Sequence, residues 1–569
     1  MVKWLDKNIL LVLGGFLLAF IPLFPKLPLF DAIPGYIVRV RLEDLLVGVT
    51  AIVWLIQVIR KKAEWKTPLT PFILAYAVIG LLSTLSAVFI TQTVPLEPLH
   101  VGKTVLHYFR YLEYFALFFF ISSAVKTRRD LKILIFIVLG TLLGIGIYGI
   151  GQKYFYWPVY STMNREFSKG IRLYLTEHAR VQSTFGGHYD LAGYLVLVLP
   201  MLLALYLSVA NGLKKHGLGI LFILSLWLVV VSGARSSFIA FVAASALVVL
   251  LKALKQAAWK QKILYFLSRY AAVMFATLIM LFTFGDDMYD RLVQGLEGYP
   301  TVYNAYRTTI KASNKISENY ILIPLGVTKE FRNKLRSGQF FGKPENAIST
   351  EDAEVLVASD QRPVSDKPSD VYVDVPDIKR VATISAEGNL EYQNIEVPRT
   401  YSENAKKYGL SVAIRLDYLW PKAIEGFMSN PLLGSGYATL TKETVYHFTE
   451  AESTDNNFLR TLGETGILGF ATFYGAIAFA IYWAYQLYKK GSKSVFVTSL
   501  AIGYIAASVG LLINATYIDV YAASKVAFTF WSMTGILFAL VQIEFGNQAI
   551  PFLKYMNRFE NRLRQFVAR

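Results

Sequence analysis

The chain has 569 residues, of which 54% are hydrophobic and 17% are charged, and its formal net charge is +17. The charged share is low for a soluble protein. There is no cysteine, which excludes disulfides, thiolate nucleophiles and cysteine–metal sites. The six histidines do not pair at metal-ligand spacing, and the sequence has no P-loop, H-E-x-x-H or G-x-S-x-G motif. These features argue against an ATP-driven pump and a zinc site.

Apolar stretches of roughly 18 to 25 residues recur along the chain, and that length crosses a bilayer as a helix. Their apolar character is continuous, whereas barrel strands alternate. The sequence therefore predicts an all-α polytopic membrane protein with about twelve transmembrane helices. The expected spans are 8–24, 43–60, 69–90, 103–125, 130–151, 190–209, 217–232, 235–252, 264–284, 457–486, 494–514 and 523–543.

Basic residues cluster in short connections between these spans and in the tail 546–569. With the N-terminus in the cytoplasm, all these clusters fall on the cytoplasmic side, which is the positive-inside pattern. This distribution argues against nucleic-acid binding. The first apolar stretch could be a signal peptide, but it has no small-residue cleavage site, so we interpret it as a retained helix. We expect both termini to be cytoplasmic.

The predicted spans divide the chain into four parts. Residues 1–284 hold spans one to nine, 285–456 form a large extracytoplasmic loop domain, 457–545 hold spans ten to twelve, and 546–569 form the basic tail. A loop of that size is a domain and not a linker. Its beginning (286–316) and its end (401–430) have helical patterns. Alternating Val, Ile and Tyr residues around an EGN turn predict a β-rich insert near 337–397, so the loop domain is of mixed α/β type.

Arg235 lies in the sequence SGARSS, a connection of four or five residues between two apolar runs on the predicted outer side. One interpretation is an arginine that snorkels to lipid headgroups. The other is a fixed cation for a lipid phosphate, because a guanidinium holds a phosphate with two parallel hydrogen bonds. The sequence leaves both open.

Arg180, His188 and Asp190 precede the sixth span, and for His188 a simple interfacial position is the favoured interpretation. Arg415 begins a segment whose apolar residues recur at helical spacing. That helix could lie along the membrane with Arg415 aimed into the bundle, or it could be an ordinary amphipathic loop helix. The apolar residues in question are Leu416, Leu419, Ala423, Ile424 and Phe427.

The stretch TDNNFLRTLGETGILGF, 454–470, places a polar cluster at the mouth of the tenth span. Asp455 is well placed to be the N-cap of that helix. Arg460 and Glu464 are four residues apart and could pair on one face. Three glycines would let a neighbouring helix approach: Gly463, Gly466 and Gly469. Ionisable groups at such a position suggest a functional site.

The segments SGARSSFIAF, RLDYLWPKAIEGFMSNPLLGSGYATL and DNNFLRTLGETGILGF occur in this order around the predicted outer loop. They resemble the O-antigen ligase and O-antigen polymerase superfamily, and RVQSTFGGHYDLAGYLVLVLPMLLAL resembles its upstream segment. The likeness covers roughly 180–481 by motif. It implies a fold of the membrane-embedded glycosyltransferase class in the bacterial plasma (inner) membrane.

Members of this superfamily transfer a glycan from an undecaprenyl-diphosphate donor to a sugar or hydroxyl acceptor, such as lipid A-core, at the outer face of the membrane. The resemblance implies that Arg235 and Arg415 hold the diphosphate, and Arg180 is a third candidate for this role. It also implies a metal-independent transfer without a nucleotide cofactor.

The superfamily usually has a histidine directly before an asparagine where this chain has Asp455 before Asn456. A carboxylate can accept a proton from an attacking hydroxyl, as an imidazole can, which gives an inverting displacement. We therefore predict Asp455 as the base and Glu464 as the group that orients Arg460 or a donor-binding arginine. If the family histidine binds the donor, that contact is lost, and His447 is a substitute by proximity alone.

Several functions fit these motifs. The motifs do not separate a ligase from a repeat-unit polymerase or a protein O-oligosaccharyltransferase. A polytopic transporter or flippase is the alternative from another class, since twelve spans suit transporters. The two halves of this chain look unlike, however, and its polar candidates lie at the outer edge of the membrane, which favours an enzyme.

Overall fold

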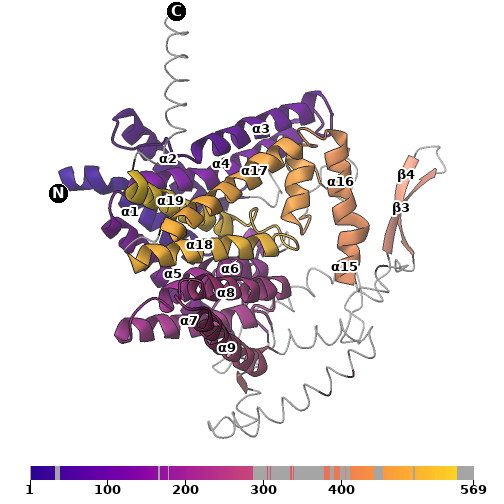
Figure 1. Ribbon diagram of the computed structural model, residues 1–569. Coiled ribbons are helices and arrows are strands. Elements are labelled where there is room, and N and C mark those ends of the chain that lie inside the picture. The colour runs from indigo at the N-terminus through magenta and orange to yellow at the C-terminus, as the bar shows by residue number, and fades with distance from the viewer. Residues whose placement is uncertain are drawn as a thin grey trace, which may run out of the picture.

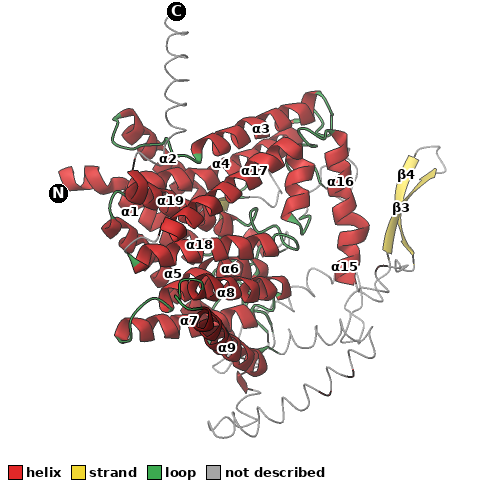
Figure 2. Ribbon diagram, in the orientation of Figure 1, coloured by secondary structure: helices red, strands yellow, loops and turns green. Residues whose placement is uncertain are grey.

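The computed structural model covers the whole chain. It describes residues 2–32, 39–163, 167–176, 179–285, 377–384, 390–397, 410–440, 453–490 and 494–546, together with six single residues between 304 and 404. Helices dominate this part of the chain (Figures 1 and 2). The long helices are α1 (Val2–Leu23), α2 (Leu42–Ile59), α3 (Thr70–Phe89), α4 (Pro98–Ala124), α5 (Arg128–Tyr154), α6 (His188–Tyr206), α7 (Leu213–Val231), α8 (Arg235–Ala253), α9 (Trp259–Phe284), α17 (Asn457–Lys490), α18 (Val495–Asn514) and α19 (Ser524–Phe545).

Each predicted span is helical, and eleven helices among the described residues are long and apolar enough to cross a membrane. The remaining long helix, α4, is not apolar enough to be among these eleven. It has 27 residues but carries Lys103, Arg110 and Glu113. Arg110 pairs with Glu113 at 3.0 Å and with Asp44 of α2. Charges inside an apolar bundle are tolerated when they are paired in this way. The chain is thus an all-α polytopic membrane protein by length and composition.

The helix termini gather at two ends of the bundle. At one end, which we call the site end, Lys525 at the start of α19 donates hydrogen bonds to the carbonyl oxygens of Pro22 and Thr184 at 3.1 and 2.8 Å. These contacts join the beginning of α19 to the end of α1 and the approach to α6. At the opposite end, which we call the basic end, Arg60 after α2 pairs with Asp6 of α1 at 2.7 Å.

The centre of the bundle is formed by α6, α18 and α19. α18 packs on α6 and α8, and α19 packs on α4. About 83%, 72% and 89% of the candidate membrane spans of α6, α18 and α19 are buried inside the protein, compared with 11% for α9. α9 therefore turns large apolar side chains outward, among them Leu264 and Phe275. Such a surface suits contact with lipid tails and not with water.

Most of the predicted loop domain 285–456 lies outside the described residues, including the helix expected at 286–316 and His447. In the predicted β-rich insert, β3 (Asp377–Ile384) and β4 (Leu390–Val397) form an antiparallel pair over eight residues each. The expected hairpin strands are confirmed. A smaller antiparallel pair, β1 (Pro28–Phe30) and β2 (Val40–Arg41), lies between α1 and α2.

The helix predicted around Arg415 is present, but it contains a π-helical turn. Its parts are α15 (Leu410–Ile414), the π turn Arg415–Leu419 and α16 (Trp420–Ser429). Of the apolar residues expected on one face, Ala423 is buried in the protein and Ile424 is exposed, and Gly426 is buried as well. A π turn takes more residues than an α turn, so it rotates the following helix relative to a regular 3.6-residue pattern.

Candidate functional site

Asp455 forms an ion pair with Arg415, the first residue of the π turn, with 2.8 Å between Oδ2 and Nη2. Its other oxygen accepts a hydrogen bond from Ser453 Oγ at 2.9 Å. The backbone of Asp455 has φ 49°, a left-handed conformation that is uncommon outside glycine and is often held in place at functional sites. Burial raises the pKa of the Asp455 carboxyl above its ordinary value, and the neighbouring Arg415 opposes this shift.

The predicted N-cap role of Asp455 is wrong, because Asn456 caps α17. The side-chain oxygen of Asn456 accepts hydrogen bonds from the backbone N–H groups of Phe458 and Leu459, each at 3.1 Å. Asn and Asp cap helices about equally well, so the sequence alone did not decide between the two neighbours. The carboxylate of Asp455 therefore serves as the counter-ion of Arg415.

Arg415 is buried, with only 8% of its surface exposed. Its guanidinium lies 4.0 Å from the centre of the Tyr517 ring, and Nη1 is 3.4 Å from the Tyr517 hydroxyl. Tyr517 belongs to the turn between α18 and α19, so this cation–π contact joins the loop helix to the bundle. π-helical turns are frequent at functional sites, where they place a side chain off the regular helical face.

The residue that organises this region, Asp519, was not among the predicted candidates. One of its oxygens accepts hydrogen bonds from the backbone N–H of Asn456 and from Thr454 Oγ1, and the other accepts from the backbone N–H of Thr454. Arg460 Nη1 lies 3.1 Å from the same carboxylate. Asp519 is 7% exposed. It fixes the backbone on both sides of Asp455, and thereby positions the Asp455 side chain.

Arg460 and Glu464 pair as predicted, with 3.4 Å between Nε and Oε1. Arg460 also pairs with Asp519, so it contacts two buried carboxylates. Glu464 Oε1 accepts a further hydrogen bond from the backbone N–H of Ala438 at 3.1 Å. The geometry therefore places Glu464 as the group that orients Arg460, and Arg460 as a structural cation.

α17 is interrupted at Gly466, where φ is 62°. The loop 431–436 pairs with the backbone groups that this break releases. The carbonyl oxygens of residues 463–464 accept hydrogen bonds from the N–H groups of 435–436 at 2.9 and 3.0 Å. The N–H groups of 467–468 donate to the carbonyl oxygens of 431–432 at 2.9 and 3.3 Å. Non-helical backbone inside a membrane bundle requires such partners. The continuous tenth span that we predicted is thus two helical pieces.

Two of the three predicted close approaches at glycines are confirmed. A Cβ atom on Gly463 would lie 2.6 Å from the carbonyl oxygen of Ala423, and one on Gly466 would lie 2.4 Å from the carbonyl carbon of Leu432. The prediction for Gly469 is wrong, because the nearest atoms to its Cβ position belong to Thr465 of the same helix. The first two glycines let the Arg415 helix and the loop 431–436 contact α17.

Arg235 is the first residue of α8 and is exposed. Its guanidinium has no ion pair or hydrogen bond with any residue that the structure describes. The connection from α7 is short, as predicted, but it has three residues, 232–234, where four or five were expected, and Arg235 belongs to the helix and not to the connection. Two residues further on, the Ser237 hydroxyl and the Asn514 side chain exchange hydrogen bonds at 3.0 and 3.2 Å. The start of α8 thus lies beside the end of α18, whose last residue, Asn514, is three residues before the Tyr517 that contacts Arg415.

Arg180 is paired with His188, with 3.0 Å between Nη1 and Nε2. His188 is the first residue of α6, at the end of a candidate span, and it is 8% exposed. The backbone N–H of Val181 donates to the carbonyl oxygen of Val231 at 3.1 Å, which places Arg180 beside the turn before Arg235.

The site end therefore gathers Arg180, Arg235, Arg415 and Asp455, and it brings the last two into contact. Within the described ranges, no group of three or more histidines and carboxylates could hold a metal ion.

No protein-family model matches this chain, and no curated protein matches its sequence. The architecture and the site define a class: a multi-pass membrane protein with charged residues gathered at one end of its helical bundle.

Proposed function

We propose that the protein is a lipid-linked glycan transferase of the O-antigen ligase type. The observation that carries this proposal is Arg235, an exposed residue at the start of α8 whose guanidinium meets no carboxylate among the described residues. A helix N-terminus has a positive partial charge and attracts anions, and a cation there is unfavourable until an anion binds. A diphosphate suits this position, since guanidinium groups hold phosphate oxygens in pairs.

In the proposed mechanism, Arg235, Arg415 and Arg180 hold the diphosphate of an undecaprenyl-diphosphate-linked glycan. The donor competes with Asp455 for Arg415, and the released carboxylate then accepts the proton of the acceptor hydroxyl. The hydroxyl oxygen forms a bond to the anomeric carbon while the bond from that carbon to the diphosphate oxygen breaks. Undecaprenyl diphosphate leaves with the bonding electrons, and the configuration at the anomeric carbon inverts.

The proposal includes an orientation in the bacterial plasma membrane. If α4 is counted with the eleven apolar helices, the chain crosses the membrane twelve times. Both termini and the basic end then face the cytoplasm, and the site end faces outward. The short basic connections support this orientation, because Lys and Arg are enriched in cytoplasmic loops. The loop domain 285–456 then lies on the outer side, where an acceptor glycan, a lipid A-core or another hydroxyl acceptor would approach the Arg415–Asp455 pair.

A repeat-unit polymerase or a protein O-oligosaccharyltransferase would use the same donor chemistry, and only the acceptor would differ. A transporter or flippase is the second candidate, because the break in α17 resembles the discontinuous helices that hold ions in transporters. In this chain, however, the backbone groups of 463–464 and 467–468 beside the break are already paired with the loop 431–436. That pairing favours the transferase.

The test is an incubation of the purified full chain with an undecaprenyl-diphosphate-linked glycan and a panel of acceptors, in which released undecaprenyl diphosphate is measured. Arg235→Ala should abolish the release, and Arg235→Lys should recover little, because an ammonium cannot form the two-pronged contact. Arg172→Ala is the matched control, since Arg172 is an exposed arginine in the α5–α6 connection. Wild-type release by both Arg235 variants would overturn the diphosphate assignment. Movement of intact donor across vesicles without release would support a flippase.

A further inference from the structure

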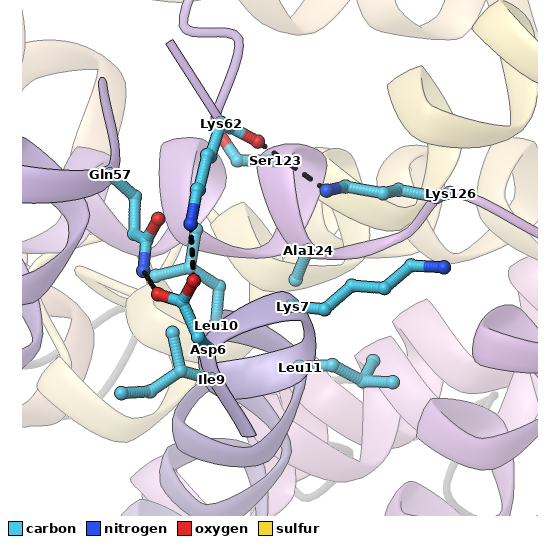
Figure 3. Close-up of a pocket in the computed structure, with 10 residues that line it drawn as sticks. All are labelled: Asp6, Lys7, Ile9, Leu10, Leu11, Gln57, Lys62, Ser123, Ala124 and Lys126. Atoms are coloured by element: carbon cyan, nitrogen blue, oxygen red, sulfur yellow. Dashed lines mark hydrogen bonds and ion pairs between the residues drawn. The ribbon is translucent and has the colours of Figure 1, made fainter. Parts of the chain in front are cut away.

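A pocket with a volume of about 340 Å³ lies at the basic end, far from the site described above (Figure 3). It is formed by the first turns of α1, the end of α2 and the end of α4. Its lining combines charged and apolar side chains: Asp6, Lys7, Ile9, Leu10, Leu11, Gln57, Lys62, Ser123, Ala124 and Lys126.

The charges in this pocket are unbalanced, with three lysines against one aspartate. Asp6 is already shared, since it pairs with Lys62 and also with Arg60 outside the lining. Figure 3 shows Lys62 turned towards Asp6, while Lys7 extends to the other side of the pocket. Lys126 Nζ donates to the carbonyl oxygen of Lys62 at 3.4 Å. Within the described residues the side-chain ammonium groups of Lys7 and Lys126 form no ion pair, although the backbone N–H of Lys126 donates to Asp130 at 3.1 Å, so the pocket attracts an anion.

The apolar part of the pocket shows what kind of anion it suits. Ile9, Leu10 and Leu11 form one wall, and α1 continues from them with Val12 and Phe16, which are exposed on the outer surface of the bundle. A ligand that fits both parts carries a negative charge at one end and an apolar chain at the other. Basic pockets between helices at the membrane surface hold anionic lipid headgroups in this manner.

One buried side-chain atom in the lining has no hydrogen-bond partner among the described residues. Gln57 is 4% exposed, its Nε2 donates to Asp6 at 3.3 Å, and its Oε1 has no hydrogen-bond donor within the described part of the chain. A buried acceptor without a donor is costly, and a hydroxyl on a bound headgroup would satisfy it. We propose that this pocket binds the phosphodiester headgroup of an anionic phospholipid of the phosphatidylglycerol type.

The test uses the purified full chain in detergent, titrated with dioleoyl-phosphatidylglycerol or dioleoyl-phosphatidylcholine, with bound lipid counted by native mass spectrometry. Phosphatidylglycerol should bind more tightly than phosphatidylcholine. Affinity should fall about fivefold for each lysine lost in Lys7→Gln and Lys126→Gln. Lys7→Arg combined with Lys126→Arg keeps the charge and should retain binding.

Lys214→Gln is the matched control, because Lys214 is an exposed lysine at the same end and outside the pocket. An equal loss in this control, or equal binding of the two lipids, would overturn the proposal. A third arm titrates inorganic phosphate, and displacement of the lipid by phosphate at similar concentration would show a site for free phosphate instead. The outcome does not depend on the transferase function, because the pocket and the site lie at opposite ends.

Discussion

Arg415 Nη2 and Asp455 Oδ2 lie 2.8 Å apart and join the π turn before α16 to the residue that precedes the cap of α17. Each side chain is the counter-ion of the other. In the proposed mechanism, the donor diphosphate takes Arg415 and releases the carboxylate of Asp455, so donor binding is coupled to the appearance of the proposed base. The pairing makes the two proposed roles, diphosphate binding and proton acceptance, depend on one contact.

Asp455→Asn separates the base from a structural role. Asn456 caps α17, so this change should leave the helix terminus intact and the protein folded. An amide does not accept a proton at neutral pH, and transfer should fall by roughly 10²–10⁴, the range for losing a general base. Asp455→His should keep partial activity. If Asp455→Asn transfers glycan at the wild-type rate, the base must be sought at Glu464, His188 or His447.

Asn456→Ala should cost about 0.5–2 kcal/mol of stability, because the N–H groups of Phe458 and Leu459 lose their acceptor. The measurement is thermal unfolding of the purified protein. Asn456→Ser supplies another good capping oxygen and should recover most of the loss. Equal melting temperatures for Asn456→Ala and the wild type would mean that the cap does not hold the start of α17.

Asp519→Asn should destabilise the protein. Asparagine has one accepting oxygen where Asp519 has two, so at least one buried donor of Thr454 or Asn456 loses its acceptor, at a cost of about 1–3 kcal/mol. Arg460 keeps Glu464 as its counter-ion. Glu425→Gln is the control, since its pair with Lys422 is exposed and should contribute less than about 1 kcal/mol. A small and equal effect of both changes on the melting temperature would show that Asp519 is not the organising residue.

The sequence predicted local features well. Runs of apolar residues predicted the twelve helices, and the four-residue spacing predicted the Arg460–Glu464 pair. Both depend on the chain near the residue itself. The break in α17 depends on residues 431–436, which lie about thirty positions away, so helical spacing could not show it.

Asp519 was missed for the same reason, since three of its four partner residues lie more than sixty residues away in the chain and the fourth, Arg460, lies 59 away. A signal did exist, because Asp519 is the one charged residue of the connection 515–523 between two apolar helices. Arg235 became a candidate because it is a charged residue between two apolar runs. The same criterion, used for every connection between predicted spans, selects Asp519 as well.

Gly466→Ala should disrupt the site. The position has φ 62°, and an added Cβ would lie 2.4 Å from backbone atoms of Leu432, which cannot move aside easily. We expect a large loss of stability or a loss of the contact with the loop 431–436, measured by thermal unfolding and by transfer activity. Gly140→Ala is the control, because nothing lies within 4 Å of its Cβ position in α5. It should be neutral or slightly stabilising, and a similar loss in both variants would contradict the close-approach argument.

The pH dependence of transfer should report Asp455. Burial raises the pKa of Asp455 above its ordinary value of 3.8, so the base is protonated and inactive in acid, and transfer should rise with pH through a limb that lies above pH 3.8. The contribution of Asp455 to folding stability changes with pH in the opposite direction. The protonated form is favoured in the folded state, so this stabilising contribution is complete below pH 3.8 and is lost as pH rises through the raised pKa.

The two kinetic parameters should differ in a defined direction. The acid limb of kcat/KM reports the free enzyme, in which Arg415 still lowers the pKa of Asp455. The limb of kcat reports the complex, in which the donor diphosphate has taken Arg415 and added negative charge nearby, so that limb should lie at higher pH. The measurement is a pH–rate profile of the wild type and of Asp455→Glu, which keeps a carboxylate and should keep a displaced limb. Identical limbs for kcat and kcat/KM would mean that the donor leaves the Arg415–Asp455 pair intact, and the coupled release of the base would have to be abandoned.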